Sequence, residues 1–143
     1  MVLFAKDIVE KDFPSLPRGT IAFEAAKQMK LGKHGFVVIA TAEGKPEGIV
    51  TEWDYLSKLV AEGKDPSKVT LGDIMSPNLI TVEASDGIDY VAKLMAEKGI
   101  RRVLVVQDGR VIGTITSRTM LARMNDYVNR VSIQIARFQA PRV

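Results

Sequence analysis

Hydrophobic residues along this chain follow helical spacing and then a strand-like run, and this succession occurs twice. The apolar positions at helical spacing are Ile21, Ala25 and Met29 in the first half and Ile88, Val91 and Met95 in the second half. Unbroken apolar runs follow over 36–40 and 103–106. A spacing of three to four residues is typical of one helix face, and a short apolar run is typical of a buried strand. The pattern therefore predicts a helix and then a strand in each half.

Turn residues and further apolar segments extend the prediction on either side. Tight turns are expected at Glu43-Gly44 and Asp108-Gly109, because such pairs favour hairpins. The other expected elements are extended pieces over 13–16 and 79–82, second strands over 48–51 and 111–116, and closing helices that carry Tyr55, Leu56, Leu59 and Val60 in the first half and Met120, Leu121, Met124, Tyr127 and Val128 in the second. Each half therefore has the predicted order β-α-β-β-α.

The ends of the first helix in each half are predicted from capping residues. Short polar side chains satisfy free backbone N–H groups, so the expected N-caps are Thr20 and Ser85-Asp86. Glycine suits the left-handed conformation at a helix exit, so the expected exits are Gly32 or Gly35 in the first half and Gly99 in the second.

The two halves also match residue by residue. The segment Lys6-Asp7-Ile8 falls on Gly72-Asp73-Ile74, and Met29 falls on Met95, at an offset of 66 residues. Several collinear matches at nearly one offset indicate an internal repeat. One such unit is too small to bury a sheet and two helices alone. The expected fold class is therefore α/β of the α+β kind, with two βαββα repeats packed as a pseudo-two-fold pair.

Three segments are expected in the domain organisation. Residues 1–63 form the first repeat, residues 64–125 the second, and residues 126–143 a C-terminal helical extension. A helix-ending glycine and a proline mark the linker at Gly63-Lys64-Asp65-Pro66. The extension has no counterpart in the first repeat. Its apolar residues predict that the last helix continues and ends before Pro141.

Composition narrows the classes of function. The chain of 143 residues has no cysteine and one histidine, His34, which excludes disulfides, thiolate metal sites and a cysteine nucleophile. No regularly spaced carboxylate loop indicates a metal site, and no nucleophile is patterned near His34. The longest apolar runs are too short to cross a bilayer, and no signal peptide is recognised. We therefore expect a cytoplasmic protein that is not an enzyme and has neither a catalytic cofactor nor a metal.

The segment Gly48–Asp54 carries the strongest indication of a ligand site. It leads from a strand into a helix start, where free N–H groups favour a phosphate, and Thr51 adds a hydroxyl. Asp54 is placed to accept hydrogen bonds from ribose hydroxyls. Alternatively, Asp54 only stabilises the helix start through the dipole. The spacing of Thr51 and Asp54, together with Arg101 and Arg102, favours the ligand site.

Three segments together resemble a CBS domain pair, also called a Bateman module. They are DIMSPNLITV at 73–82, GIRRVLVV at 99–106 and GIVTEWD at 48–54, and the resemblance covers residues 5–124. It implies two clefts between the repeats, assembly into flat homodimers, and binding of AMP, ADP, ATP, or S-adenosylmethionine and its relatives.

The resemblance implies that Thr51 and Asp54 face the arginines of the opposite repeat, and arginine suits bidentate phosphate binding. Leu79, Ile80 and Ile100 are expected as apolar walls for an adenine, and Trp53 either lines the cleft or packs at a subunit contact. The expected ligand-binding residues are Thr51, Trp53, Asp54, Leu79, Ile80, Ile100, Arg101 and Arg102.

A second cleft departs from the family pattern. Its expected residues are Leu16, His34, Gly35, Phe36, Thr116, Arg118 and Thr119. Thr119 occupies the position of the ribose-binding aspartate, so we expect this second site to be degenerate or weaker. Arg118 is the candidate phosphate contact that keeps it open.

The expected function is that of a regulatory sensor of adenine nucleotides, with AMP favoured over ADP and ATP. Its expected partners are a second copy in a homodimer and a regulated protein that the sequence does not identify. The alternatives are a sensor of an S-adenosylmethionine-type ligand and a basic protein associated with nucleic acid. The isoelectric point of about 9.2 supports the nucleic-acid alternative, but no nucleic-acid-binding signature does, so it ranks below the others.

Overall fold

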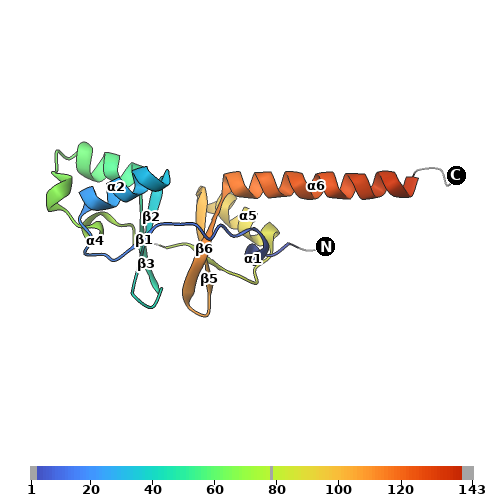
Figure 1. The fold of residues 1–143 in the computed structure, drawn as a ribbon, viewed down its shortest axis with the longest axis horizontal. Coiled ribbons are helices and arrows are strands. Elements are labelled where there is room, and N and C mark those ends of the chain that lie inside the picture. Colours follow the sequence, from blue (N-terminus) through green and yellow to red (C-terminus); the bar gives the residue numbers. More distant parts are fainter. Residues whose placement is uncertain (1–2, 78, 140–143) are drawn as a thin grey trace.

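A computed structural model describes residues 3–77 and 79–139 of the chain. Two three-stranded sheets lie beside each other, and helices cover the outer side of each sheet (Figure 1). The first sheet contains β1 (Ser15–Leu16), β2 (Phe36–Ala40) and β3 (Pro46–Thr51), and the second contains β4 (Thr81–Glu83), β5 (Arg102–Gln107) and β6 (Arg110–Thr116). The helices are α1 (Ala5–Ile8), α2 (Ala22–Gly32), α3 (Glu52–Asp54) with a π-helical continuation at Tyr55–Val60, a 3-10 turn at Pro66–Lys68, α4 (Leu71–Ile74), α5 (Ile88–Lys98) and α6 (Ser117–Gln139).

The two sheets have the same topology, which confirms the predicted fold class. In each sheet the first strand pairs in parallel with the second, and the second pairs antiparallel with the third. Even the register irregularity recurs, between Ile39 and Ala40 in β2 and between Val105 and Val106 in β5. The sheets pack on each other through a cluster of buried residues, namely Phe36, Val38, Ala40 and Leu104. This cluster forms the interface between the repeats.

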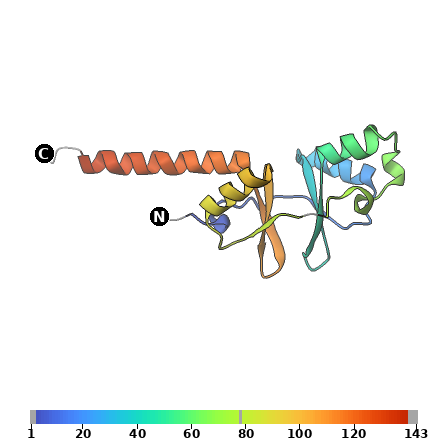
Figure 2. The ribbon, with the colours of Figure 1, turned by 180° about the vertical axis from the view of Figure 1, so that it is seen from behind.

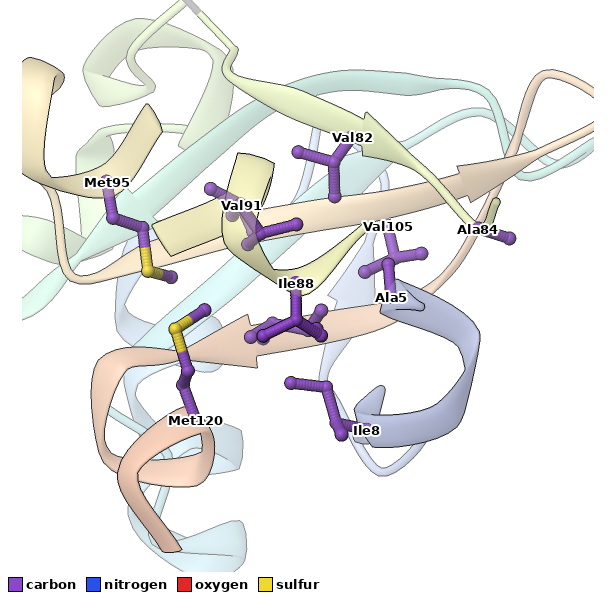
Figure 3. Close-up of a cluster of buried hydrophobic side chains, with 11 residues drawn as sticks. Ala5, Ile8, Val82, Ala84, Ile88, Val91, Met95, Val105 and Met120 are labelled. Carbon is purple, nitrogen blue, oxygen red and sulfur yellow. The ribbon is translucent and has the colours of Figure 1, made fainter. Parts of the chain in front are cut away.

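Each repeat's core is completed by a short helix from the segment that precedes the other repeat. Ala5 and Ile8 on α1 are buried with Val91 and Val105 of the second repeat (Figure 3). Leu71 and Ile74 on α4 are buried in the core of the first repeat. The crossing segments then bridge to the sheet edges, with Glu10 opposite Thr114 on β6 and Ser76 opposite Ile49 on β3. The two repeats therefore share their buried structure.

This exchange explains why the predicted helix N-caps are wrong. The N-cap positions of α2 and α5 are Ile21 and Gly87, not Thr20 or Ser85-Asp86, and neither cap makes a side-chain hydrogen bond. The first amides of the two helices instead donate to backbone carbonyls of the crossing segments. Ala22 N donates to Val69 O over 2.8 Å, and Ile88 N donates to Leu3 O over 3.0 Å. Backbone partners thus replace the capping side chains that the sequence predicts.

The exit of α5 is as predicted, but the exit of α2 is not. Gly99 takes the left-handed conformation after α5 with φ of 62°, and Lys33 takes it after α2 with φ of 55°. Gly32 lies inside the helix and Gly35 lies beyond its exit, so neither of them takes the cap position. The repeat explains this, because Lys33 is the counterpart of Gly99 at the same offset.

We expect Lys33→Gly to raise the free energy of unfolding by about 0.5–1 kcal/mol, because glycine relieves a left-handed conformation that costs a residue with a Cβ. The reciprocal variant Gly99→Ala is the matched control. A Cβ there meets no atom within 4 Å, so any loss comes from the backbone alone. Urea denaturation of both variants measures the two effects. Equal stabilities of wild type and Lys33→Gly would contradict this interpretation.

The last helix extends beyond the second repeat as predicted. α6 begins at Ser117 and ends at Gln139, before Pro141, which lies outside the described residues. Seen from both sides, α6 runs past α5 and α1 and away from the sheets (Figure 2). Within the described part of the chain, no helix is long and apolar enough to span a membrane.

Candidate functional site

A cleft of about 680 Å³ lies between the repeats, where β3 and α3 face the segment before β5. All eight residues predicted for the first site line it, namely Thr51, Trp53, Asp54, Leu79, Ile80, Ile100, Arg101 and Arg102. Six further residues line this cleft that were not predicted for it, namely Gly35, Ile49, Glu52, Ser76, Gly99 and Leu104. Several of these belong to crossing or neighbouring segments that only the packing of the two repeats brings together. The structure therefore gathers the predicted residues from both repeats at one place.

Asp54 is the buried acidic group of this cleft, with 7% of its surface exposed. Its Oδ2 accepts from Thr51 N over 2.8 Å and from Thr51 Oγ1 over 3.2 Å, which closes a capping box at the start of α3. Its Oδ1 lies 3.0 Å from Lys58 Nζ, and Lys58 also donates to Ile74 O. Asp54 therefore stabilises the start of α3, which is the alternative to ligand binding that was considered for it from the sequence. A carboxylate has about four acceptor sites, so this role leaves room for a further donor.

The capping role predicts a stability effect at Asp54. We expect Asp54→Ala to lower the free energy of unfolding by about 1–2 kcal/mol, because the amide and hydroxyl of Thr51 lose their acceptor. Asp54→Asn is the matched control, since its side-chain oxygen still accepts from the Thr51 amide. We expect Asp54→Asn to be closer to wild type in thermal unfolding. Identical losses in the two variants would contradict the capping interpretation.

Arg102 lies in the wall between this cleft and the second one. Its Cζ lies 4.0 Å from the centroid of the Phe36 ring, a distance that fits a cation–π contact. Burial lowers the pKa of the Arg102 guanidinium, whereas the carboxylates of Glu52 and Glu10 act in the opposite direction. Among the described residues, its Nε is buried without a hydrogen-bond partner. Arg102 lines both clefts, which the sequence did not indicate.

The second cleft, of about 650 Å³, lies at the pseudo-symmetric position. Six of the seven predicted residues line it, namely His34, Gly35, Phe36, Thr116, Arg118 and Thr119. Leu16 does not, and its assignment to this site is wrong. Leu16 lies on the two-residue strand β1, pairs with Ile39, and packs against the core of the first repeat.

A carboxylate is present in the second cleft although Thr119 occupies the aspartate position. Thr119 Oγ1 donates a short hydrogen bond to Glu10 Oε1, and Thr119 N donates to Thr116 Oγ1 over 3.1 Å. Glu10 belongs to the crossing segment after α1 and lies 109 residues before Thr119 in the chain. Glu10 reaches this cleft only because the crossing segment passes it. The motif around Thr119 therefore does not indicate that Glu10 is there. The two clefts therefore differ in which residue carries the acid.

Within residues 3–77 and 79–139, no group of three or more His, Cys, Asp or Glu side chains is placed to hold a metal ion. Trp53 lines the first cleft, and 69% of its surface is exposed. This position is compatible with contact to a ligand and with packing against another subunit. The chemistry of the clefts is thus that of hydrogen-bond acceptors, arginines and apolar walls, which suits an organic ligand.

Comparison with known proteins gives a consistent family match. The model of the CBS domain matches this chain twice, over residues 5–61 and 71–126. An uncharacterized protein of Methanopyrus kandleri is 39% identical over 82% of this chain, which spans 61% of that protein. A homoserine O-acetyltransferase of Methanocorpusculum labreanum is 29% identical over 80% of this chain, which spans only 23% of the enzyme.

Solved structures show the same arrangement. A CBS domain pair in complex with 5′-methylthioadenosine and S-adenosyl-L-methionine has a TM-score of 0.77 and 30% identity, covering 89% of this chain and 99% of that one. A hexameric CBS-CP12 protein from bloom-forming cyanobacteria has a TM-score of 0.76 and 31% identity, covering 85% of this chain and 67% of that one.

Proposed function

This chain belongs to the CBS domain family, and from that premise we propose that it binds an adenosine ligand in the cleft around Asp54. One observation carries the proposal: the eight residues that the sequence predicts for this role come from both repeats and line a single cleft of about 680 Å³. The volume falls in the range of small-molecule sites. Apolar walls at Leu79, Ile80 and Ile100 suit an adenine, and the Asp54 carboxylate suits the hydroxyls of a ribose.

AMP is the ligand that we favour. Arg101 lines the cleft and is exposed to solvent, so its guanidinium is free to turn toward a phosphate, which arginine binds in a bidentate manner. ADP and ATP present the same first phosphate. The second cleft, with Glu10 in place of the aspartate, is proposed as a weaker site in which Arg118 contacts the phosphate.

S-adenosylmethionine and its relatives form the second candidate class. The complex of the 30% identical CBS domain pair with 5′-methylthioadenosine and S-adenosyl-L-methionine favours them. These ligands share the adenosine moiety with AMP but lack its phosphate. The two classes therefore differ in how much binding depends on Arg101.

We further propose that the chain is regulatory and has no catalytic activity of its own. A ligand that contacts both repeats changes their arrangement only if it binds two arrangements with different affinity. A partner protein would then respond to that difference.

Calorimetric titration with AMP, ADP, ATP, S-adenosylmethionine and 5′-methylthioadenosine tests the proposal. We expect Asp54→Asn to weaken binding about tenfold or more, since a hydrogen bond to a charged acceptor contributes about 1.5–3 kcal/mol. Arg101→Ala should weaken AMP binding and leave 5′-methylthioadenosine binding unchanged. Arg110→Ala, at an exposed arginine that lines neither cleft, is the matched control. Absence of heat with all five ligands, together with no thermal stabilisation, would overturn the proposal.

A further inference from the structure

α6 carries a continuous apolar stripe that begins in the second repeat and continues along the C-terminal extension. Its residues follow the 3-4-3-4-3 spacing of a coiled-coil heptad, and we refer to them together as the apolar seam: Leu121, Met124, Val128, Val131, Ile135 and Phe138. Five of the six are exposed large hydrophobic side chains, and Phe138 is 92% exposed. An unpartnered apolar stripe of this length is unusual on a monomer.

The body of the protein contacts a different face of α6. Met120 is buried in the core of the second repeat, and Arg123 donates through Nη2 to Asp7 O over 3.3 Å. A hollow between α1 and α6 is lined by Arg123, Asp126, Tyr127 and Arg130. At 100° per residue, Met120 and Tyr127 lie beside the apolar seam, whereas Arg123, Asp126 and Arg130 lie more than about 100° from its centre. Intramolecular packing therefore leaves the apolar seam uncovered.

We propose that α6 forms a two-stranded coiled coil with the α6 of a second copy of this chain. The residues that flank the apolar seam from Met120 to Gln139 are all uncharged, namely Met120, Asn125, Tyr127, Ser132, Gln134 and Gln139. Flanking positions set partner choice through charge, so uncharged ones allow two identical helices to meet without repulsion. Arg123, Arg130 and Arg137 recur every seven residues on a face away from the apolar seam.

The residues inside the apolar seam also fit a pair of helices. Val128, Val131 and Ile135 are β-branched and the other seam residues are also apolar, as the seam of a coiled coil requires. If each seam side chain loses on the order of 100 Å² of exposed surface, the two copies bury about 1,200 Å², near the lower limit of a stable interface. The helix itself needs such a partner, because an isolated helix of about four turns is marginal in water.

Sedimentation equilibrium of the full chain tests the coiled coil with a matched pair of variants. Ile135 in the apolar seam is 51% exposed, and Ile133 on the opposite side of α6 is 54% exposed. We expect a monomer–dimer equilibrium between about 1 and 300 µM, with Ile135→Glu raising the dissociation constant more than about tenfold and Ile133→Glu changing it less than about threefold. Val128→Glu should act like Ile135→Glu, and all three variants should keep the thermal unfolding of the two repeats.

Three results would overturn the proposal. The first is a wild-type chain that stays monomeric at about 300 µM, the upper end of the concentration range in which we expect the dimer to form. The second is a dimer that Ile135→Glu and Val128→Glu leave unchanged, which would place the contact elsewhere. The third is an equal effect of Ile133→Glu. Binding of a DNA duplex by a monomeric chain, lost with added salt, would instead assign the arginine face of α6 to nucleic acid.

Discussion

Replacing Gly113 with alanine is expected to lower the free energy of unfolding by about 2–3 kcal/mol, because the new methyl group has no space. A Cβ at Gly113 would overlap Glu10 O and Val9 Cγ2, both in the crossing segment after α1. That segment is fixed by two backbone hydrogen bonds, Glu10 N to Thr114 O over 2.9 Å and Thr114 N to Glu10 O over 3.0 Å. Because the N–H and the C=O of Glu10 are both hydrogen-bonded to Thr114, this backbone cannot withdraw without losing these bonds.

Gly48→Ala is the matched control, since Gly48 is the counterpart of Gly113 in the first repeat. A Cβ at Gly48 would meet the flexible side chain of Met75, with Sδ at 2.6 Å, and no backbone atom is among its nearest neighbours. Methionine has three rotatable bonds and adapts easily, so we expect a loss of about 1 kcal/mol or less. Urea denaturation measures both variants. A loss at Gly48 as large as that at Gly113 would show that crowding by the crossing backbone is not the cause.

The sequence predicted the repeated βαββα units because their signals are local. Helical spacing in α2 and α5, apolar runs in β2 and β5, and turn residues such as Asp108-Gly109 act within a few positions of the chain. The exchange of α1 and α4 between the cores depends on long-range packing, so it leaves no local signal. The wrong N-caps have the same cause, since Val69 and Leu3 supply the acceptors from distant segments.

The residues of the candidate site that belong to sequence motifs could be predicted, and the others could not. Thr51, Asp54 and Arg101 come from segments that the repeat and the family pattern both mark, and the structure places all three in one cleft. Glu10 was missed because its contact with Thr119 spans 109 residues. Leu16 was misplaced because a strand of two residues gives too little alternation to show which side faces the core.

Ile8→Ala is expected to destabilise the second repeat, and Ile74→Ala is expected to destabilise the first. Ile8 belongs to the first repeat in the chain but is buried in the second core, and Ile74 is its counterpart in the first core. They are 4% and 2% exposed, so each truncation should lower the free energy of unfolding by about 2–5 kcal/mol. Since each core depends on a segment of the other repeat, both repeats should unfold in one transition.

Trp53, the single tryptophan, makes this cooperativity measurable because it lies in the first repeat. In Ile8→Ala the fluorescence of Trp53 reports on a repeat whose own core is intact, whereas far-UV circular dichroism reports on both repeats. We expect the two signals to shift together to lower urea concentration, which is the test of a two-state transition. A Trp53 transition that stays at its wild-type midpoint while the circular dichroism becomes biphasic would show that the repeats unfold independently. The two clefts between the repeats would then rest on two separately stable halves rather than on one shared core.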